Sequence, residues 1–129
     1  MKICISASGR KEQSLLNSRF GRCPYFLIFN SQTGKWEAKE NQSIAAFRGA
    51  GVSAAQKVLD WGCKAVITGN MGPNAFRVME AAGIKVYLGD IGKSVAENLK
   101  MYREGKLSEL AVPGRAGMGI GWGRRWRKQ

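Results

Sequence analysis

The sequence predicts an α/β fold in which helices flank a five-stranded mixed sheet of order 3-2-1-4-5. Three strand-like segments come first, with no helical pattern between them, and such strands can form an antiparallel meander. Two further strand-like segments each follow a stretch with the periodicity of an amphipathic helix. Strands joined through helical crossovers lie parallel in one sheet, and placing the first strand beside the fourth completes the order.

The N-terminal segments predict three strands and one long loop. Residues 2–6 alternate apolar side chains around Cys4 and predict a short strand. Residues 7–24 are polar and aperiodic, which predicts a loop of a length that is usually functional or mobile in a compact domain. Residues 25–29, YFLIF, predict a central strand. Residues 35–39, KWEAK, predict an edge strand whose charges face outward and which forms a hairpin with the strand before it.

A glycine-rich start predicts the first helix. Two glycines within residues 49–51 precede an apolar periodicity that predicts a helix from about 52 to 61. We expect its inner face to carry Val52, Ala55 and Leu59.

The central unit, residues 66–87, predicts a strand, a helix and a second strand. An apolar strand over 65–68 leads into a glycine-bracketed turn, and Pro73 stands at the first helical position, where a missing N–H costs nothing. One face of this helix carries apolar residues at every third position: Phe76, Met79 and Ala82. Residues 84–88 predict the last strand. The loop before the helix presents free backbone N–H groups, which favour a negatively charged ligand.

The C-terminal part predicts one more helix and a tail. Ser94 lies near the helix start, and one face carries Val95, Leu99 and Tyr102. We expect one domain over residues 1–110, with residues 107–110 packed on its body. Residues 111–129 predict a flexible basic tail, because their glycine, tryptophan and arginine content is too poor in aliphatic residues to fold alone. The predicted order of elements matches the ribonuclease-H-like topology.

The composition excludes several classes of protein. The 129-residue chain has a net charge of +12, three cysteines and no histidine. An odd number of widely spaced cysteines argues against a disulfide framework and a zinc knuckle, and no apolar run reaches the length of a membrane span. Because the start shows no signal-peptide pattern, we expect a cytoplasmic protein. The charge predicts an anionic partner: nucleic acid, a membrane surface, an acidic protein or an anionic cofactor.

The predicted topology gathers several loops at one edge of the sheet. Ligands of open α/β sheets bind at the carboxyl ends of parallel strands, where helix N-termini favour anions. The candidate cofactor-binding residues at this edge are Arg22, Cys23, Gly49, Gly51, Gly69, Asn70, Gly72 and Asn74. Cys23 is also the candidate metal ligand, since neighbouring arginines favour a thiolate. The alternatives are that the glycines serve only turns and that Cys23 is an inert thiol.

Four segments carry a resemblance to a known family: FGRCPYF at 20–26, GAGVSAAQKVLDWGCKAVITGNMGPNAF at 49–76, AAGIKVY at 81–87 and EGKLSEL at 104–110. They resemble the dinitrogenase iron–molybdenum cofactor biosynthesis family, which includes NifX-like proteins, the C-terminal part of some NifB proteins and small stand-alone members. The resemblance covers nearly all of residues 1–110. It implies a ribonuclease-H-like fold and the binding or carriage of an iron–sulfur-type or iron–molybdenum-type cluster, or its precursor, without turnover.

One feature departs from that family. Many members carry a histidine, a candidate ligand, in the connector before the GAG segment, whereas residues 41–48 contain none here. Cys23 is then the one candidate thiolate ligand at this edge, and one thiolate is too few for a standard cluster. Two interpretations stay open. Either a shuttle holds a preformed anionic cluster through one ligand plus N–H and arginine contacts, or this member has lost cluster binding.

Three functions compete for this sequence. The first is a carrier of an anionic metal cluster or precursor, with nitrogenase-type or cluster-assembly proteins as partners. The second is a nucleic-acid-binding protein that uses the basic surface and the arginine-rich tail around Trp122 and Trp126, a tail equally suited to an anionic membrane. The third, a metal-dependent nuclease, needs clustered carboxylates, and the acidic residues do not converge in the predicted topology. We therefore expect no catalysis.

Overall fold

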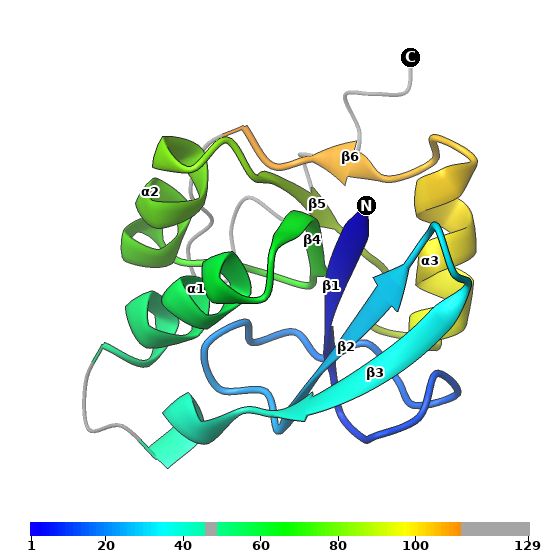
Figure 1. Ribbon diagram of the computed structural model, residues 1–129, viewed down its shortest axis with the longest axis horizontal. Helices are drawn as coiled ribbons and strands as arrows, with labels where there is room; N and C mark the ends of the chain where they lie inside the picture. The colour runs from blue at the N-terminus through cyan, green and yellow to red at the C-terminus, as the bar shows by residue number, and fades with distance from the viewer. Residues whose placement is uncertain (46–48, 112–129) are drawn as a thin grey trace.

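The computed structural model describes residues 1–45 and 49–111, which form a mixed sheet with helices on both faces (Figure 1). The strands are β1 (Lys2–Ala7), β2 (Tyr25–Asn30), β3 (Lys35–Glu40), β4 (Cys63–Thr68), β5 (Lys85–Leu88) and β6 (Ser108–Glu109). The helices are the 3₁₀ helix η1 (Gln42–Ala45), α1 (Ala50–Asp60), α2 (Pro73–Ala81) and α3 (Val95–Arg103).

The strand order is β3-β2-β1-β4-β5-β6. β1 pairs antiparallel with β2 and parallel with β4, β2 pairs antiparallel with β3, and β4 pairs parallel with β5. The predicted mixed sheet of order 3-2-1-4-5 is therefore confirmed, and it is compatible with the ribonuclease-H-like topology. β6 extends the sheet beyond the prediction, since Tyr87 of β5 pairs with Glu109. A strand of two residues is too short to show a period in the sequence.

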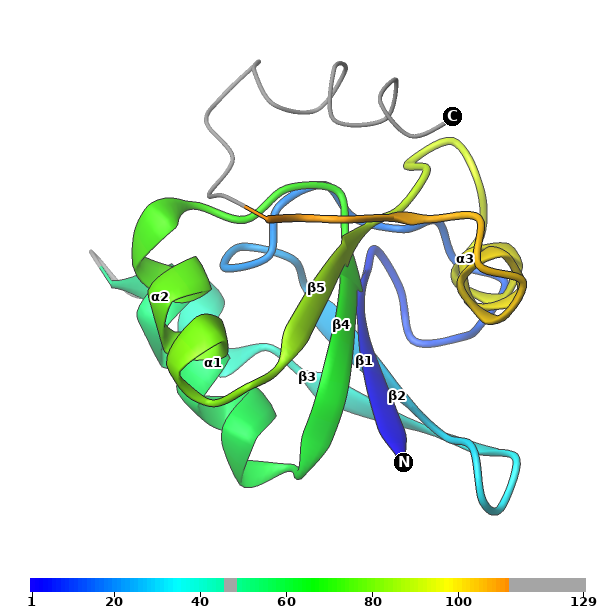
Figure 2. The same ribbon diagram turned by 90° about the horizontal axis from the view of Figure 1, so that it is seen from above.

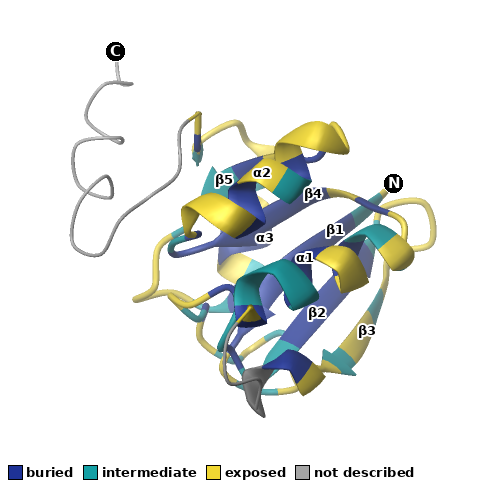
Figure 3. Cartoon of the chain, turned by 90° about the vertical axis from the view of Figure 1, so that its left-hand side faces the viewer, coloured by how far each residue is buried: buried dark blue, intermediate teal, exposed yellow. Residues whose placement is uncertain are grey.

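The sheet separates two hydrophobic cores. α1 and α2 cover one face and α3 covers the other (Figure 2). Successive residues of a strand point to opposite faces, so Cys4 packs in the core under α1 and α2, whereas Ile3 and Ile5 pack in the core under α3. Figure 3 shows the buried strands behind the two helices, whose outer sides are exposed. Cys63 also lies in the first core, as expected of a small apolar side chain.

α1 differs from its predicted span and face. It begins at Ala50, and its buried residues are Ala50, Ala54, Ala55 and Val58. Val52 and Leu59, which we expected on the inner face, are only half-buried. The small residues face inward because α1 packs closely against α2: a Cβ built on Gly51 would lie 3.4 Å from the Cβ of Ala75. Ala82, expected on the apolar face of α2, lies just beyond that helix and is exposed.

The long loop between β1 and β2 is packed onto the body of the domain. Its buried side chains are Leu16, Phe20 and Cys23. The backbone N–H of Leu16 donates to the carbonyl of Lys93 at 3.1 Å, which joins this loop to the segment before α3. The loop thus has a defined position at the edge of the sheet where β1 and β4 end and β2 begins.

Two further expectations concern regions other than the sheet. The predicted tail over 112–129, with Trp122 and Trp126, lies outside the described residues. Across the described ranges, every helix is too short or too polar to cross a membrane.

Candidate functional site

A cleft with a volume of about 380 Å³ opens at the edge of the sheet where the parallel strands end. Three segments distant in sequence form its walls: the loop before β2, the start of α1, and the turn from β4 into α2. The residues that line it are Ser18, Arg19, Phe20, Gly21, Arg22, Gly49, Ala50, Gly51, Val52, Asn70, Gly72, Pro73, Asn74 and Ala75.

Two helix N-termini open into this cleft. α1 begins after Gly49, whose φ of 77° is left-handed, and α2 begins after Gly72. Within the described residues neither helix has a side-chain cap, and neither has an acid in its first turn. The first N–H groups of a helix lack intrahelical partners, so Gly51, Val52 and Asn74, which all line the cleft, carry backbone donors that an anion can use. Both helix dipoles place partial positive charge there as well.

The N-terminus of α3, unlike those of α1 and α2, is capped by side chains of its own segment. The N–H of Glu97 donates to Ser94 Oγ at 3.0 Å, and the N–H of Ser94 donates to Glu97 Oε1 at 2.9 Å. Hydrogen bonds from the backbone N–H and then the side chain of Ser94 lower the pKa of the Glu97 carboxyl, and its negative charge also complements the dipole. α1 and α2 lack both features, which leaves their N-termini receptive to an external anion.

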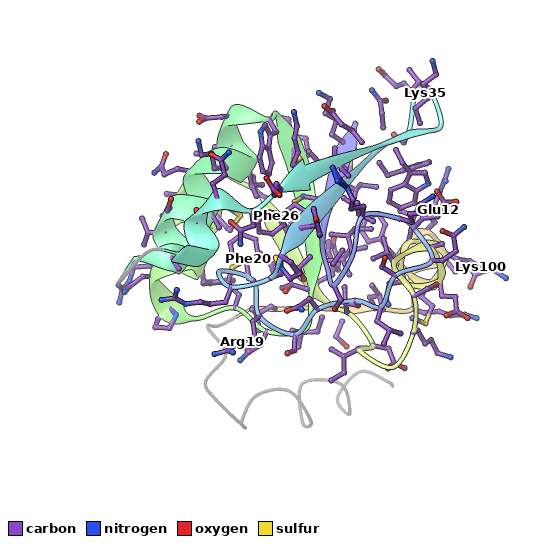
Figure 4. The ribbon with its side chains drawn as sticks, turned by 90° about the horizontal axis from the view of Figure 1, so that it is seen from below. Glu12, Arg19, Phe20, Phe26, Lys35 and Lys100 are labelled. Atoms are coloured by element: carbon purple, nitrogen blue, oxygen red, sulfur yellow. The ribbon has the colours of Figure 1, made fainter. Side chains whose placement is uncertain are left out.

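Two arginines add full positive charge to the loop wall of the cleft. Arg19 and Arg22 both line it, and none of its described lining residues is acidic. Figure 4 shows Arg19 extending outward from the edge of the molecule, while Phe20 is turned toward the interior. The backbone N–H of Arg19 donates to Asn17 Oδ1 at 2.9 Å, which fixes the start of this turn. The cleft therefore combines charged and backbone donors suited to a negatively charged ligand.

A buried polar network lies beside the cleft. Ser6 Oγ donates to Thr68 Oγ1 at 2.8 Å, and Thr68 Oγ1 donates to the carbonyl of Asn70 at 3.4 Å. The side chain of Asn70 lines the cleft, and its Oδ1 is a buried acceptor with no hydrogen-bond partner among the described residues. Because an unsatisfied buried acceptor costs about 1–3 kcal/mol, this atom favours a ligand or water that brings a donor.

Seven of the eight predicted cofactor-binding residues are either in the cleft or beside it, but they differ in role. Arg22, Gly49, Gly51, Asn70, Gly72 and Asn74 all line the cleft. Gly69 does not line it. A Cβ on Gly69 would lie 2.6 Å from the Cα of Ser18, so this glycine allows the loop wall to approach the end of β4. Its role is the structural one that the sequence left open.

Cys23, the eighth residue and the predicted metal ligand, is positioned differently. Its side chain is fully buried and does not line the cleft. Its Sγ–H donates to the carbonyl of Phe20 at 3.4 Å. Burial raises the pKa of the thiol to about 12, against the weaker lowering effect of backbone hydrogen bonds. This geometry does not support the expectation that neighbouring arginines favour a thiolate, because burial disfavours the charged form of the thiol.

With Cys23 buried, the described part of the chain offers the cleft hydrogen-bond donors rather than metal ligands. The described residues contain no group of three or more histidine, cysteine, aspartate or glutamate side chains arranged to hold a metal ion. The donors of the cleft are N–H groups and guanidinium groups, which contact the outer atoms of an anion rather than coordinate a metal. Arg19, Gly21 and Ser18 also line the cleft, although they are not among the residues predicted from the sequence. The FGR segment at 20–22 contains Gly21, and Ser18 and Arg19 directly precede it.

Fold and cleft together define a small α/β domain with an anion-receptive edge. Residues 1–105 match the family model described as dinitrogenase iron–molybdenum cofactor, and the chain belongs to this family. The resemblance found in the sequence is thereby confirmed.

Three relatives illustrate the match. An uncharacterized protein of Methanocaldococcus jannaschii is 32% identical over 113 residues, which cover 85% of this chain and 92% of that protein. The apo form of the orange protein from Desulfovibrio gigas has a similar structure, with a TM-score of 0.85 and 32% identity over 88% of this chain and 96% of its own. A NifB-like protein from Thermotoga gives a TM-score of 0.79 and 34% identity over 90% of this chain and 98% of its own.

Proposed function

We propose that this protein binds an anionic metal cluster, or an anionic precursor of one, as cargo in the cleft and releases it unchanged. Membership of the family fits a cofactor-binding or carrier role. The observation that carries the proposal is the convergence of two uncapped helix N-termini and two arginines on one cleft that has no acidic lining residue in the described part of the chain.

The mode of binding follows from the donor set. The cargo is held through its outer atoms by the N–H groups of Gly51, Val52 and Asn74 and by the guanidinium groups of Arg19 and Arg22. Cys23 does not act as a ligand in this proposal because its thiol is buried and stays protonated. Binding without a covalent ligand suits a carrier, because release then breaks hydrogen bonds only. A cluster-assembly protein is the expected partner for delivery.

The proposal is tested by anaerobic titration with a preformed anionic iron–sulfur cluster and, separately, by titration with molybdate. We expect a visible charge-transfer band in the first case and saturable binding in the second. Arg19→Gln should weaken molybdate binding about two- to fivefold, as for one solvated charge contact. Lys100→Gln is the matched control, since it removes one positive charge from α3 on the far side of the sheet (Figure 4).

Two results would count against the proposal. A wild-type protein that stays colourless and metal-free after titration with the preformed cluster and binds no molybdate would remove the cargo role. Equal weakening by Arg19→Gln and Lys100→Gln would show that the overall charge, rather than the cleft, attracts the anion.

A further inference from the structure

We propose that Asn41 is the positioning residue of the cleft, which holds the Gly21–Cys23 segment of its loop wall at a set distance from the N-terminus of α1. This inference rests on the proposed function. Asn41 does not line the cleft. It lines a separate cavity of about 240 Å³ with Lys57 and Trp61. Any effect of Asn41 on binding must therefore pass through the loop.

Both polar groups of the Asn41 side chain are hydrogen-bonded: Nδ2 holds this loop, and Oδ1 holds the start of η1. The residue is 4% exposed. Its Nδ2 donates to the carbonyl of Cys23 at 2.7 Å and to that of Gly21 at 3.1 Å. Its backbone N–H donates to the carbonyl of Pro24 at 2.9 Å, and its Oδ1 accepts from the N–H of Ser43 at 3.0 Å. Three of the four carbonyls from Gly21 to Pro24 thus accept hydrogen bonds from a single residue.

The opposite end of this network reaches α1. Ser43 is 5% exposed, and its Oγ donates to Ser53 Oγ at 2.7 Å. Ser53 lies in the first turn of α1, and its N–H donates to the carbonyl of Gly49 at 2.9 Å. A Cβ on Gly21 would lie 2.7 Å from the backbone N of Gly51, so loop and helix touch directly here. The contacts form a closed ring of loop, η1 and helix start that sets the relative position of two cleft walls.

The chemistry of this ring requires an amide at position 41. Two carbonyl oxygens face Nδ2, and only a group with two N–H bonds satisfies both. Asn41→Asp keeps the shape and the acceptor toward Ser43 but places a carboxylate oxygen against the carbonyls of Gly21 and Cys23. The repulsion should push the loop wall away from α1 without changing any lining residue.

Asn98→Asp is a matched control for this substitution. Asn98 is fully buried, and its Nδ2 donates to the carbonyls of Asp90 and Ser94 at 3.0 and 2.9 Å. Its Oδ1 accepts from the N–H of Asp90 at 2.7 Å. The substitution therefore breaks the same kind of network, but in a turn that contributes no lining residue to the cleft.

The experiment measures molybdate affinity and backbone amide shifts for the wild-type protein and both variants, at a temperature where circular dichroism shows all three folded. Asn41→Asp should weaken molybdate binding about tenfold, as loss of a supporting hydrogen-bond shell does, and should shift the amides of Gly21 and Gly51. Asn98→Asp should change the affinity less than twofold. If Asn41→Asp does not fold, Ser43→Ala cuts the Ser43–Ser53 bond more mildly and should weaken binding about threefold.

The outcomes separate the two proposals. A wild-type protein that binds no molybdate and takes up no cluster overturns the proposed function, and the role of Asn41 in binding falls with it. If the wild-type protein binds but Asn41→Asp binds equally well, or if both Asp variants lose affinity to the same extent, the assignment of Asn41 is overturned and the proposed function stands.

Discussion

Gly21 and Gly51 are in direct backbone contact although thirty positions separate them in the chain: a Cβ on Gly21 would lie 2.7 Å from the N atom and 2.8 Å from the Cα of Gly51. This contact joins the loop wall of the cleft to the first turn of α1. It places the arginines of one segment beside the donors of the other, and it leaves no room for a side chain at position 21.

Gly21→Ala should therefore lower both stability and anion affinity. Relief of the contact requires the loop or α1 to move, and overpacking of this kind costs about 1–3 kcal/mol. Chemical denaturation followed by circular dichroism measures the loss. Gly72→Ala is the control, because its added Cβ meets nothing within 4 Å and its φ of −76° suits alanine. A stability change at Gly21 no larger than at Gly72 would contradict the close packing.

Asn74→Asp should separate stability from binding. An acid in the first turn of α2 complements the helix dipole and should stabilise the protein by about 0.5 kcal/mol. It keeps the oxygen acceptor that Arg77 Nη1 contacts at 3.1 Å. The same negative charge lies in the cleft wall and should weaken molybdate binding. Thermal denaturation and titration test the two effects, and tighter molybdate binding would argue against an anion site at this helix end.

Cys23→Ala should retain cluster uptake and molybdate binding. The thiol lies outside the cleft lining and donates to the carbonyl of Phe20, so its removal costs about 1 kcal/mol of stability, as a typical core change does, but takes no ligand away. Anaerobic titration with a preformed anionic iron–sulfur cluster compares the two proteins. Loss of the charge-transfer band in a folded Cys23→Ala protein would restore the cysteine as a ligand and contradict the donor-only mode of binding.

The buried Cys23 thiol should also make stability fall at alkaline pH. Its pKa is raised by burial from the usual 9.0 to about 12. Between these values the unfolded chain loses the proton and the native state keeps it, so the native state binds more protons and stability decreases as pH rises. The contribution is complete below about pH 9 and declines toward pH 12 by up to about 1.4 kcal/mol per pH unit.

Urea denaturation of the wild-type protein and Cys23→Ala across this range isolates the effect, because Tyr87 and Tyr102, whose pKa values are also raised by burial, are common to both. Parallel stability curves for the two proteins would show that Cys23 ionises normally in the native state.

The sequence alone determined the order of the elements, the pairing scheme of the first five strands and the two glycine-bounded helix starts. These features depend on local periodicity and on residues such as Pro73 and Gly49, which fix or permit the backbone conformation at their own positions. The family membership was also evident from the sequence, because the FGRC, GAG and GNMGPNAF segments resemble the family whose model matches residues 1–105. Together they predicted which loops meet at one edge of the sheet.

Only the tertiary structure decided what each residue does at that edge. Cys23 follows Arg19 and Arg22 in a loop that forms one wall of the cleft, yet its side chain is buried. This burial depends on residues distant in sequence, such as Asn41, that pack around it. Gly69 permits a loop from far along the chain to approach, and β6 forms because β5 offers an edge to pair with. Such properties arise from contacts between segments remote in sequence, and no local pattern encodes them.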